Sequence, residues 1–264
     1  MKAYQHILIE DKQYVRTIWL NRPEKHNAFN PLLIHELQEA FVLCAKDQDI
    51  RVILLRGSGK SFCAGADLEY MHDISRFGID ENKADALKLA GLFETVYLCP
   101  KPVIAVVHGS VYGGANGLAA ASDIVLADED TKFAFTEVKL GITPATISPY
   151  VIARSGRAAA SELMLTGRRF TAKEAYRYML VNELFTSETL QTQLDYYIGN
   201  LMYAGPQAVA ACKALIHEVV SMSLDNPQLK EYTSRQIAQQ RATAEAKEGI
   251  QAFFEKRNPK WTQP

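Results

Sequence analysis

The chain contains 264 residues, of which 48% are hydrophobic and 22% are charged. This balance is typical of a globular protein and excludes extensive disorder, which requires low hydrophobicity and high net charge. The formal net charge of -1 lacks the basic excess of nucleic-acid-binding proteins, so we expect no nucleic-acid partner.

The cysteines and the apolar runs limit the remaining classes of protein. Cys44, Cys63, Cys99 and Cys212 are widely spaced, with no CxxC pair and no histidine cluster nearby. We therefore expect no metal site and no disulfide framework, which favours a reducing compartment and a cytoplasmic location. No apolar run approaches the roughly 20 residues needed to cross a bilayer, and the first residues lack the features of a signal peptide. We expect no membrane partner.

Strand and helix patterns alternate along the chain as far as about residue 150. A helix is predicted to begin near Asn30, which can act as the N-cap before Pro31, and its apolar face would include Leu37 and Phe41. Two further helices are predicted at residues 80–98 and 115–121. Strands are predicted at residues 6–10, 15–20, 51–56, 103–107, 124–127 and 132–135.

Helical patterns dominate the rest of the chain. They cover residues 156–165, 172–178, 188–202, 206–221 and 226–256. We therefore predict an α/β core over residues 1–195, followed by a helical region over residues 196–264. This second region is expected to pack on the core or on a neighbouring subunit.

The first segment that indicates chemistry covers residues 61–68 (SFCAGADL). It follows a predicted strand and enters a helix that starts at an aspartate. Its small residues let the backbone approach a ligand closely, so the N–H of Ala66 can point into a pocket. An ordinary tight turn between a strand and a helix would have a similar composition.

The second segment covers residues 108–118 (HGSVYGGANGL), where a strand ends, glycines follow and a helix starts. Free N–H groups and the positive end of the helix dipole suit an anion or a developing oxyanion. A glycine turn that only packs closely is the alternative. The Lys-Ser/Thr ending of a phosphate loop is missing, and the glycine spacing of a dinucleotide site is not met.

The third segment covers residues 133–144 (FAFTEVKLGITP), in which Glu137 has mostly apolar neighbours. Burial raises the pKa of a carboxylate toward the range useful for proton transfer, although pairing with Lys139 or simple exposure would make the residue inert. Two amide donors and one carboxylate are what the enolate chemistry of a thioester requires.

The order and spacing of these segments resemble those of the crotonase, or enoyl-CoA hydratase/isomerase, superfamily. The resemblance extends over nearly the whole chain, starting at residues 19–23 (WLNRP). It implies an α/β fold, a spiral of ββα repeats with a C-terminal helical trimerisation region, in a homotrimer or a dimer of trimers. It also implies an acyl-CoA thioester as the substrate, with coenzyme A as part of that substrate and no separate cofactor.

The resemblance also assigns roles to individual residues. The N–H groups of Ala66 and Gly114 are expected to form the oxyanion hole, and Glu137 is expected to lie over the α and β carbons of the acyl group. The coenzyme A site is expected to involve the residues that match the family pattern: Lys25, Ala28, Ala64, Asp67, Leu68 and Gly113.

One position departs from the family pattern. Gly117 stands where many hydratases carry a second glutamate, and a glycine cannot act as an acid or a base. Residues 136–151 resemble those of bacterial methylglutaconyl-CoA and isohexenylglutaconyl-CoA hydratases, which serve leucine and terpene breakdown. The predicted activity is therefore hydration of a 2-enoyl-CoA, with 3-methylglutaconyl-CoA as a candidate. A Δ3-Δ2-enoyl-CoA isomerase that uses Glu137 alone and a non-catalytic CoA-ester-binding protein remain alternatives.

Two sets of neighbouring side chains bear on this prediction. Asn116 and Tyr112 are close in sequence to the missing glutamate and could orient the attacking water, but packing is the favoured role for both. A dicarboxylic acyl group would require a cation, for which sequence proximity offers Arg154, Arg157 and Lys139.

Overall fold

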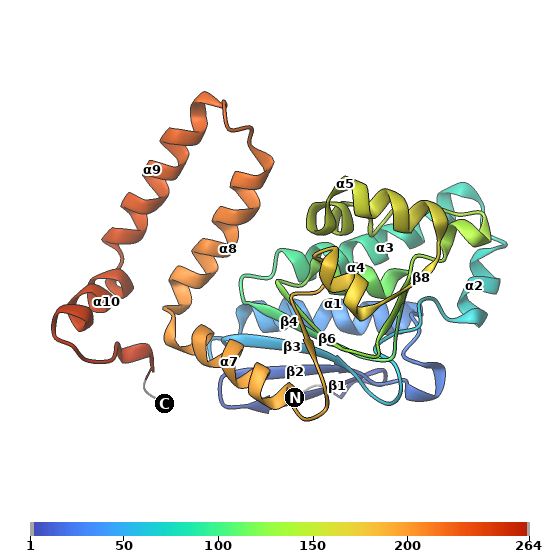
Figure 1. Cartoon of the computed structure of the whole chain (residues 1–264), viewed down its shortest axis with the longest axis horizontal. Helices are drawn as coiled ribbons and strands as arrows, with labels where there is room; N and C mark the ends of the chain where they lie inside the picture. Colours follow the sequence, from blue (N-terminus) through green and yellow to red (C-terminus); the bar gives the residue numbers. More distant parts are fainter. Residues whose placement is uncertain (1–2, 263–264) are drawn as a thin grey trace. The chain divides into compact units, whose positions relative to one another are not determined.

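The computed structural model describes residues 3–262 and divides into two compact units (Figure 1). The first unit comprises residues 1–99 and 103–190, and the second comprises residues 100–102 and 191–264. All three segments that indicate chemistry belong to the first unit. Within residues 3–262, no helix is both long enough and apolar enough to cross a bilayer.

A six-stranded sheet forms one layer of the first unit. Its strands, in spatial order, are β1 (Ile7–Lys12), β2 (Val15–Leu20), β3 (Val52–Gly57), β4 (Val103–Val107), β6 (Ile124–Asp128) and β9 (Glu183–Phe185). β1 and β2 coincide with the first two predicted strands and form an antiparallel hairpin, and every later pair in this sheet is parallel. β4 is an uninterrupted apolar run whose residues are all buried, as expected for a parallel strand covered on both faces.

A second layer is formed by short strands that follow those of the first layer along the chain. It contains β5 (Ser110–Tyr112), β7 (Lys132–Ala134) and β8 (Arg169–Thr171), in that order. Single bridges between Cys63 and Val111 and between Phe29 and Ala66 add earlier parts of the chain to the same layer. The chain thus passes repeatedly from one layer to the other, and the predicted spiral of ββα repeats is confirmed.

The passage from β4 to β5 requires a glycine at position 109. Gly109 has a φ of +62°, and a Cβ at this position would overlap the carbonyl oxygen of Lys60. The sequence pattern indicates only a turn at residues 109–114, whereas the structure has a strand there. β5, β8 and β9 contain three residues each, which is too few for an alternating pattern to be recognised.

Helices cover one side of the six-stranded sheet. In Figure 1, α1 (Pro31–Lys46), α3 (Ile79–Tyr97), α4 (Gly114–Ala121) and α5 (Ser148–Thr166) lie on the same side of it. The side chain of Asn30 accepts a hydrogen bond from the Leu33 N–H, which confirms the predicted N-cap. α5 begins eight residues earlier than predicted and is kinked at Gly156, whose φ of 75° and ψ of 165° are not helical.

The buried residues of the first unit connect these helices to the sheet. Leu37 and Phe41 of α1 are completely buried, as predicted, and lie in one core with Ile53 and Phe93. Two short helices complete this unit, α2 (Leu68–Ile74) and α6 (Ala172–Arg177). α4, which begins at the predicted oxyanion residue Gly114, is buried along its whole length except for Gly114.

The second unit is helical. It contains α7 (Leu190–Tyr203), α8 (Pro206–Ser221), α9 (Pro227–Ala242) and α10 (Ala244–Phe254). The single helix predicted over residues 226–256 is wrong, because Thr243 adopts an extended conformation, ends α9 and caps α10 through its side chain. The Glu245 carboxylate accepts hydrogen bonds from the N–H groups of Gln207 and Ala208, which connects α10 to the start of α8.

Candidate active site

The three segments that indicate chemistry meet beside Gly113. A Cβ built on Gly113 would lie 3.4 Å from Glu137 Oε1 and 4.0 Å from the Cα of Gly65. Backbone hydrogen bonds hold the segments in this arrangement: the Tyr112 N–H donates to the Cys63 carbonyl at 3.1 Å, and the Gly113 N–H donates to the Ala134 carbonyl at 3.0 Å. Segments separated by about 70 positions in the sequence therefore border one site.

The N–H of Ala66 points away from Phe29, the residue with which Ala66 forms an isolated bridge. The Phe29 N–H donates to the Gly65 carbonyl at 2.7 Å, and the Asp67 N–H donates to the Phe29 carbonyl at 2.9 Å. Because the C=O and N–H of a trans peptide point in opposite directions, the Ala66 N–H points away from Phe29. Within residues 3–262 this N–H has no backbone acceptor, so it is available to a ligand.

The N–H of Gly114 is presented in the same way. Gly113 has a φ of 52° and a ψ of -124°, a combination essentially restricted to glycine. The Gly113 carbonyl accepts from the Asn116 N–H at 3.0 Å, so the Gly114 N–H at the other end of the same peptide points away from α4. As the first residue of α4, Gly114 has no intrahelical acceptor and adds the positive end of the helix dipole.

Glu137 supplies the predicted catalytic carboxylate of the site. It starts a short 3₁₀ helix, Glu137–Leu140, after β7. Its Oε2 atom is buried and has no hydrogen-bond partner within the described residues, and burial raises the pKa of the carboxyl group. Lys139 is exposed, and within residues 3–262 it forms no ion pair with Glu137. Glu137 is therefore placed to exchange a proton with a bound molecule.

Most of the residues predicted to bind coenzyme A line one cavity of about 350 Å³. It also includes Glu24 and His26, whose roles the motifs do not indicate, although both flank Lys25. Gly113 is not among the lining residues and lies beside Glu137 instead. The cavity is lined by Glu24, Lys25, His26, Ala28, Ala64, Ala66, Asp67 and Leu68.

Asp67 lines this cavity, but its carboxylate is engaged with the protein. It accepts from Arg22 Nη2 at 2.8 Å and from the Glu69 N–H at 3.0 Å, which caps α2. Burial alone would raise the pKa of Asp67, but the hydrogen bonds from Arg22 and Glu69 hold it below its usual value. Arg22 also donates to the Ala28 carbonyl at 2.6 Å. Arg22 lies in the WLNRP stretch, but the composition of that stretch does not indicate that this buried arginine supports the cavity wall.

Comparison with known proteins agrees with this geometry. Residues 10–264 match the family model described as enoyl-CoA hydratase/isomerase. The chain belongs to the enoyl-CoA hydratase/isomerase family. It is 33% identical over 257 residues to crotonyl-CoA hydratase of Syntrophomonas wolfei, with 97% of each chain covered.

Solved structures show the same relationship. The chain matches an enoyl-CoA hydratase from Shewanella pealeana with a TM-score of 0.94 and 36% identity, covering 97% of this chain and 96% of that one. It matches Pseudomonas aeruginosa AtuE with a TM-score of 0.93 and 35% identity, covering 98% and 100% of the two chains. These matches confirm the predicted membership of the crotonase superfamily.

Within this family fold, position 117 has no room for a side chain unless its neighbours shift. A Cβ on Gly117 would overlap Cγ2 of Ile147 and lie 2.9 Å from Cζ of Phe93. Both neighbours are almost completely buried. The site therefore has an apolar wall where many hydratases are expected to carry a second glutamate, and Glu137 is the carboxylate that lies beside Gly113.

Three of the remaining polar candidates contact other parts of the protein. Asn116 donates to backbone carbonyls, and the Arg169 guanidinium lies 5.7 Å from the centre of the Tyr112 ring. Arg154 donates to the Ser122 carbonyl at 2.8 Å, to the Leu180 carbonyl at 3.0 Å and to Asn182. Burial lowers the pKa of Arg154 to about 10, which still leaves it a cation at neutral pH. Its N–H groups, however, are hydrogen-bonded to other parts of the protein.

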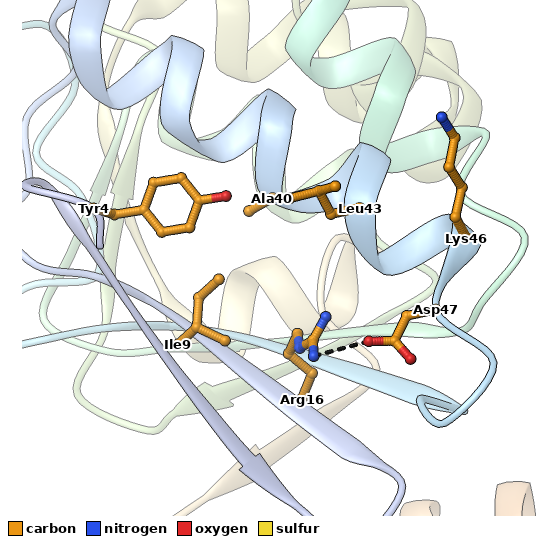
Figure 2. A pocket seen from close by; sticks show the side chains of 7 residues that line it. All are labelled: Tyr4, Ile9, Arg16, Ala40, Leu43, Lys46 and Asp47. Atoms are coloured by element: carbon orange, nitrogen blue, oxygen red, sulfur yellow. Dashed lines mark ion pairs between the residues drawn. The ribbon is translucent and has the colours of Figure 1, made fainter. Parts of the chain in front are cut away.

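A second cavity, of about 380 Å³, lies between the β1–β2 hairpin and α1 (Figure 2). Arg16 there is paired with Asp11 at 2.7 Å and with Asp47 at 3.0 Å, so its charge is balanced within the protein. None of the predicted site residues contributes to this cavity. It is lined by Tyr4, Ile9, Arg16, Ala40, Leu43, Lys46 and Asp47.

Proposed function

We propose that the protein is an enoyl-CoA hydratase, which adds water across the double bond of a 2-enoyl-CoA thioester. The observation that carries this proposal is that two segments with N–H groups free of backbone acceptors lie beside Gly113, next to the Glu137 carboxylate, whose buried Oε2 has no hydrogen-bond partner within the described residues. The cavity next to Ala66 offers room for the coenzyme A part of the substrate.

The proposed reaction begins with the thioester oxygen between the N–H groups of Ala66 and Gly114. Glu137 takes a proton from a water molecule as the water oxygen bonds to the β carbon. The electron pair of the double bond moves toward the carbonyl, and the two N–H groups stabilise the negative charge on its oxygen. The proton held by Glu137 then passes to the α carbon, which restores the carboxylate. Because position 117 is closed, no second carboxylate takes part at that point.

An isomerase is the second candidate, and the closed position 117 favours it. A single carboxylate is sufficient to carry one proton from the α carbon of a 3-enoyl-CoA to its γ carbon, which needs no water. A CoA-ester-binding protein without catalysis is the third candidate. It would need no carboxylate with a raised pKa beside the acyl group.

The acyl group is the finer part of the proposal. The support for 3-methylglutaconyl-CoA in leucine breakdown is the resemblance of residues 136–151. Its terminal carboxylate would need a cation, and the donors of Arg154 are already used. Arg157 and Lys139 are exposed and remain candidates for that role.

One assay separates these candidates. The purified protein is mixed with crotonyl-CoA, with 3-methylglutaconyl-CoA and with a 3-enoyl-CoA, and the absorbance of the conjugated enoyl thioester is followed. Loss of absorbance with either 2-enoyl ester supports hydration, and a preference for the methylglutaconyl ester supports the leucine pathway. A gain of absorbance from the 3-enoyl ester without any hydration would replace the hydratase by the isomerase. No change with all three esters would favour the binding protein.

The proposal includes a homotrimer or a dimer of trimers in the cytoplasm. Its support in the second unit is a set of exposed apolar side chains that water would solvate poorly in a monomer: Val220, Leu224, Ile250, Phe253 and Phe254. No two cysteines form a disulfide within the described residues, which agrees with a reducing compartment. Sedimentation equilibrium should give three or six times the mass of the chain, and a monomer would contradict the proposal.

A further inference from the structure

Asn116 makes an unusual set of buried hydrogen bonds in the first turn of α4. Its side chain is 3% exposed, and its Nδ2 donates to the carbonyls of Val111 at 3.2 Å, Gly113 at 3.2 Å and Ala134 at 3.0 Å. Two N–H groups thus serve three acceptors, which lie in β5, in the turn before α4 and in β7. One side chain thereby connects the two strands and the turn that border the candidate site.

The bond to the Gly113 carbonyl bears directly on the oxyanion hole. This carbonyl and the Gly114 N–H belong to the same peptide, so the direction of one fixes the direction of the other. Asn116 holds the carbonyl twice, through its backbone N–H at 3.0 Å and through Nδ2 at 3.2 Å. Because Gly113 has a torsional freedom that other residues lack, the orientation of this peptide depends on such bonds.

The bond to the Ala134 carbonyl connects this peptide to the catalytic carboxylate. The same carbonyl accepts from the Gly113 N–H at 3.0 Å, so Gly113 and Asn116 are joined at one point of β7. Glu137 follows only three residues later in the chain. Asn116 therefore bears on both the direction of the Gly114 N–H and its position relative to Glu137.

We propose that Asn116 is a positioning residue, which orients the Gly113–Gly114 peptide so that the Gly114 N–H meets the thioester oxygen. It acts through the backbone, because its Nδ2 is already engaged with three carbonyls. The inference rests on the proposed function in one respect, namely that a thioester oxygen is the group bound by this N–H.

The test uses butyryl-CoA with ¹³C at the thioester carbonyl, which has no double bond to hydrate. Hydrogen bonds to a carbonyl oxygen lower its stretching frequency, so the infrared band of the bound ester reports the oxyanion hole directly. Four proteins are compared: the wild type, Asn116→Ala, Asn116→Ser and Ser122→Ala. Ser122 is the matched control, because its buried hydroxyl donates to the Leu118 carbonyl at 2.9 Å at the other end of α4.

The expected result is an ordered series. The wild type and Ser122→Ala lower the carbonyl frequency by the same amount, and Asn116→Ala lowers it less. Asn116→Ser falls between them, because a serine hydroxyl can donate to the carbonyl three residues earlier, which is that of Gly113. If the wild type hydrates crotonyl-CoA, kcat of Asn116→Ala falls by about 10²–10³, as for the loss of one oxyanion donor, while KM changes only a few-fold.

A wild-type carbonyl frequency in Asn116→Ala would overturn the proposal. It would also be overturned if the lowering of the carbonyl frequency were reduced as much in Ser122→Ala as in Asn116→Ala. If Asn116→Ala does not fold, a wild-type frequency and wild-type kcat in Asn116→Ser would overturn it instead. The infrared band does not depend on turnover. A protein that shows the ordered series but hydrates no enoyl-CoA would therefore contradict the proposed function and leave the role of Asn116 intact.

Discussion

Ile147 occupies the space that a side chain on Gly117 would need. A Cβ there would overlap Ile147 Cγ2, and Phe93 Cζ would lie only 2.9 Å away on another side. Both neighbours belong to the buried core, so neither can move without disturbing other contacts. The absence of a second glutamate therefore depends on the packing around α4 as well as on the residue at position 117.

Replacing Gly117 should consequently destabilise the protein and should not improve catalysis. Gly117→Ala is expected to lower the free energy of unfolding by about 1–3 kcal/mol through overpacking, partly offset by the roughly 1 kcal/mol better helix propensity of alanine. Gly117→Glu should lower the free energy of unfolding further and should hydrate crotonyl-CoA no faster than the wild type. Urea unfolding and the absorbance assay measure both effects. The control is Gly199→Ala in α7, where a Cβ meets no atom within 4 Å and should be tolerated.

Relief of the contact provides an independent check. In a Gly117→Ala/Ile147→Ala double variant, the added methyl group should fill part of the cavity left by Ile147. The double variant should therefore be more stable than the sum of the two single changes predicts. Strict additivity of the unfolding free energies would show that the two residues do not compete for the same space.

Glu137→Gln should remove most turnover and leave ester binding intact. Glutamine has nearly the same shape but cannot accept and return a proton, so kcat should fall by about 10²–10⁴. Calorimetry with butyryl-CoA should give an unchanged affinity. Glu129→Gln, at an exposed turn after β6, is the control and should behave as the wild type. Full activity in Glu137→Gln would remove Glu137 from the mechanism.

The raised pKa of Glu137 also predicts two dependences on pH. As a base it must be deprotonated, so kcat/KM should fall as the pH drops through a pKa above the ordinary value of 4.5. Stability changes in the opposite sense, because the unfolded chain releases this proton at a lower pH than the folded one. The wild type therefore loses stability relative to Glu137→Gln as pH rises through this window. The melting temperatures of the two proteins should converge near pH 4 and differ near pH 8, with Glu137→Gln the higher.

The Arg22–Asp67 pair predicts a large effect from a residue outside the three segments that indicate chemistry. Arg22→Ala would leave the buried Asp67 carboxylate without its cation, which typically costs about 3–5 kcal/mol. Glu69→Ala breaks the exposed pair with Lys25 and should cost only about 0–1 kcal/mol. Urea unfolding of both variants measures the contrast. Equal stability of the two would mean that the buried pair contributes nothing to this wall of the cavity.

Much of the fold could be predicted because its signals are local. The first two strands, the Asn30 cap and the strands β3 and β4 each depend on neighbouring residues, and the structure agrees with all of them. The short strands of the second layer have no such signal, since their pairing involves residues far away in the chain. The break between α9 and α10 at Thr243 could not be predicted, because the residues on both sides of it have a helical pattern.

The candidate site shows the same limit. The glycine segments and Glu137 could be selected from the sequence because their composition is unusual. Their meeting at Gly113, the buried partner of Asp67 and the closure of position 117 by Ile147 depend on contacts between residues more than 20 positions apart. Such contacts cannot be predicted from a single sequence unless it resembles a family in which they are known.

The two proposed oxyanion donors are main-chain N–H groups, so amino-acid substitutions do not remove them directly. Any amino acid other than proline at positions 66 and 114 still provides an N–H, so a substitution scan would score both positions by steric fit alone. Such a scan would locate Glu137 and overlook half of the chemistry. Only a backbone change, such as an ester bond in place of the amide preceding Ala66 or Gly114, deletes one donor while leaving every side chain in place.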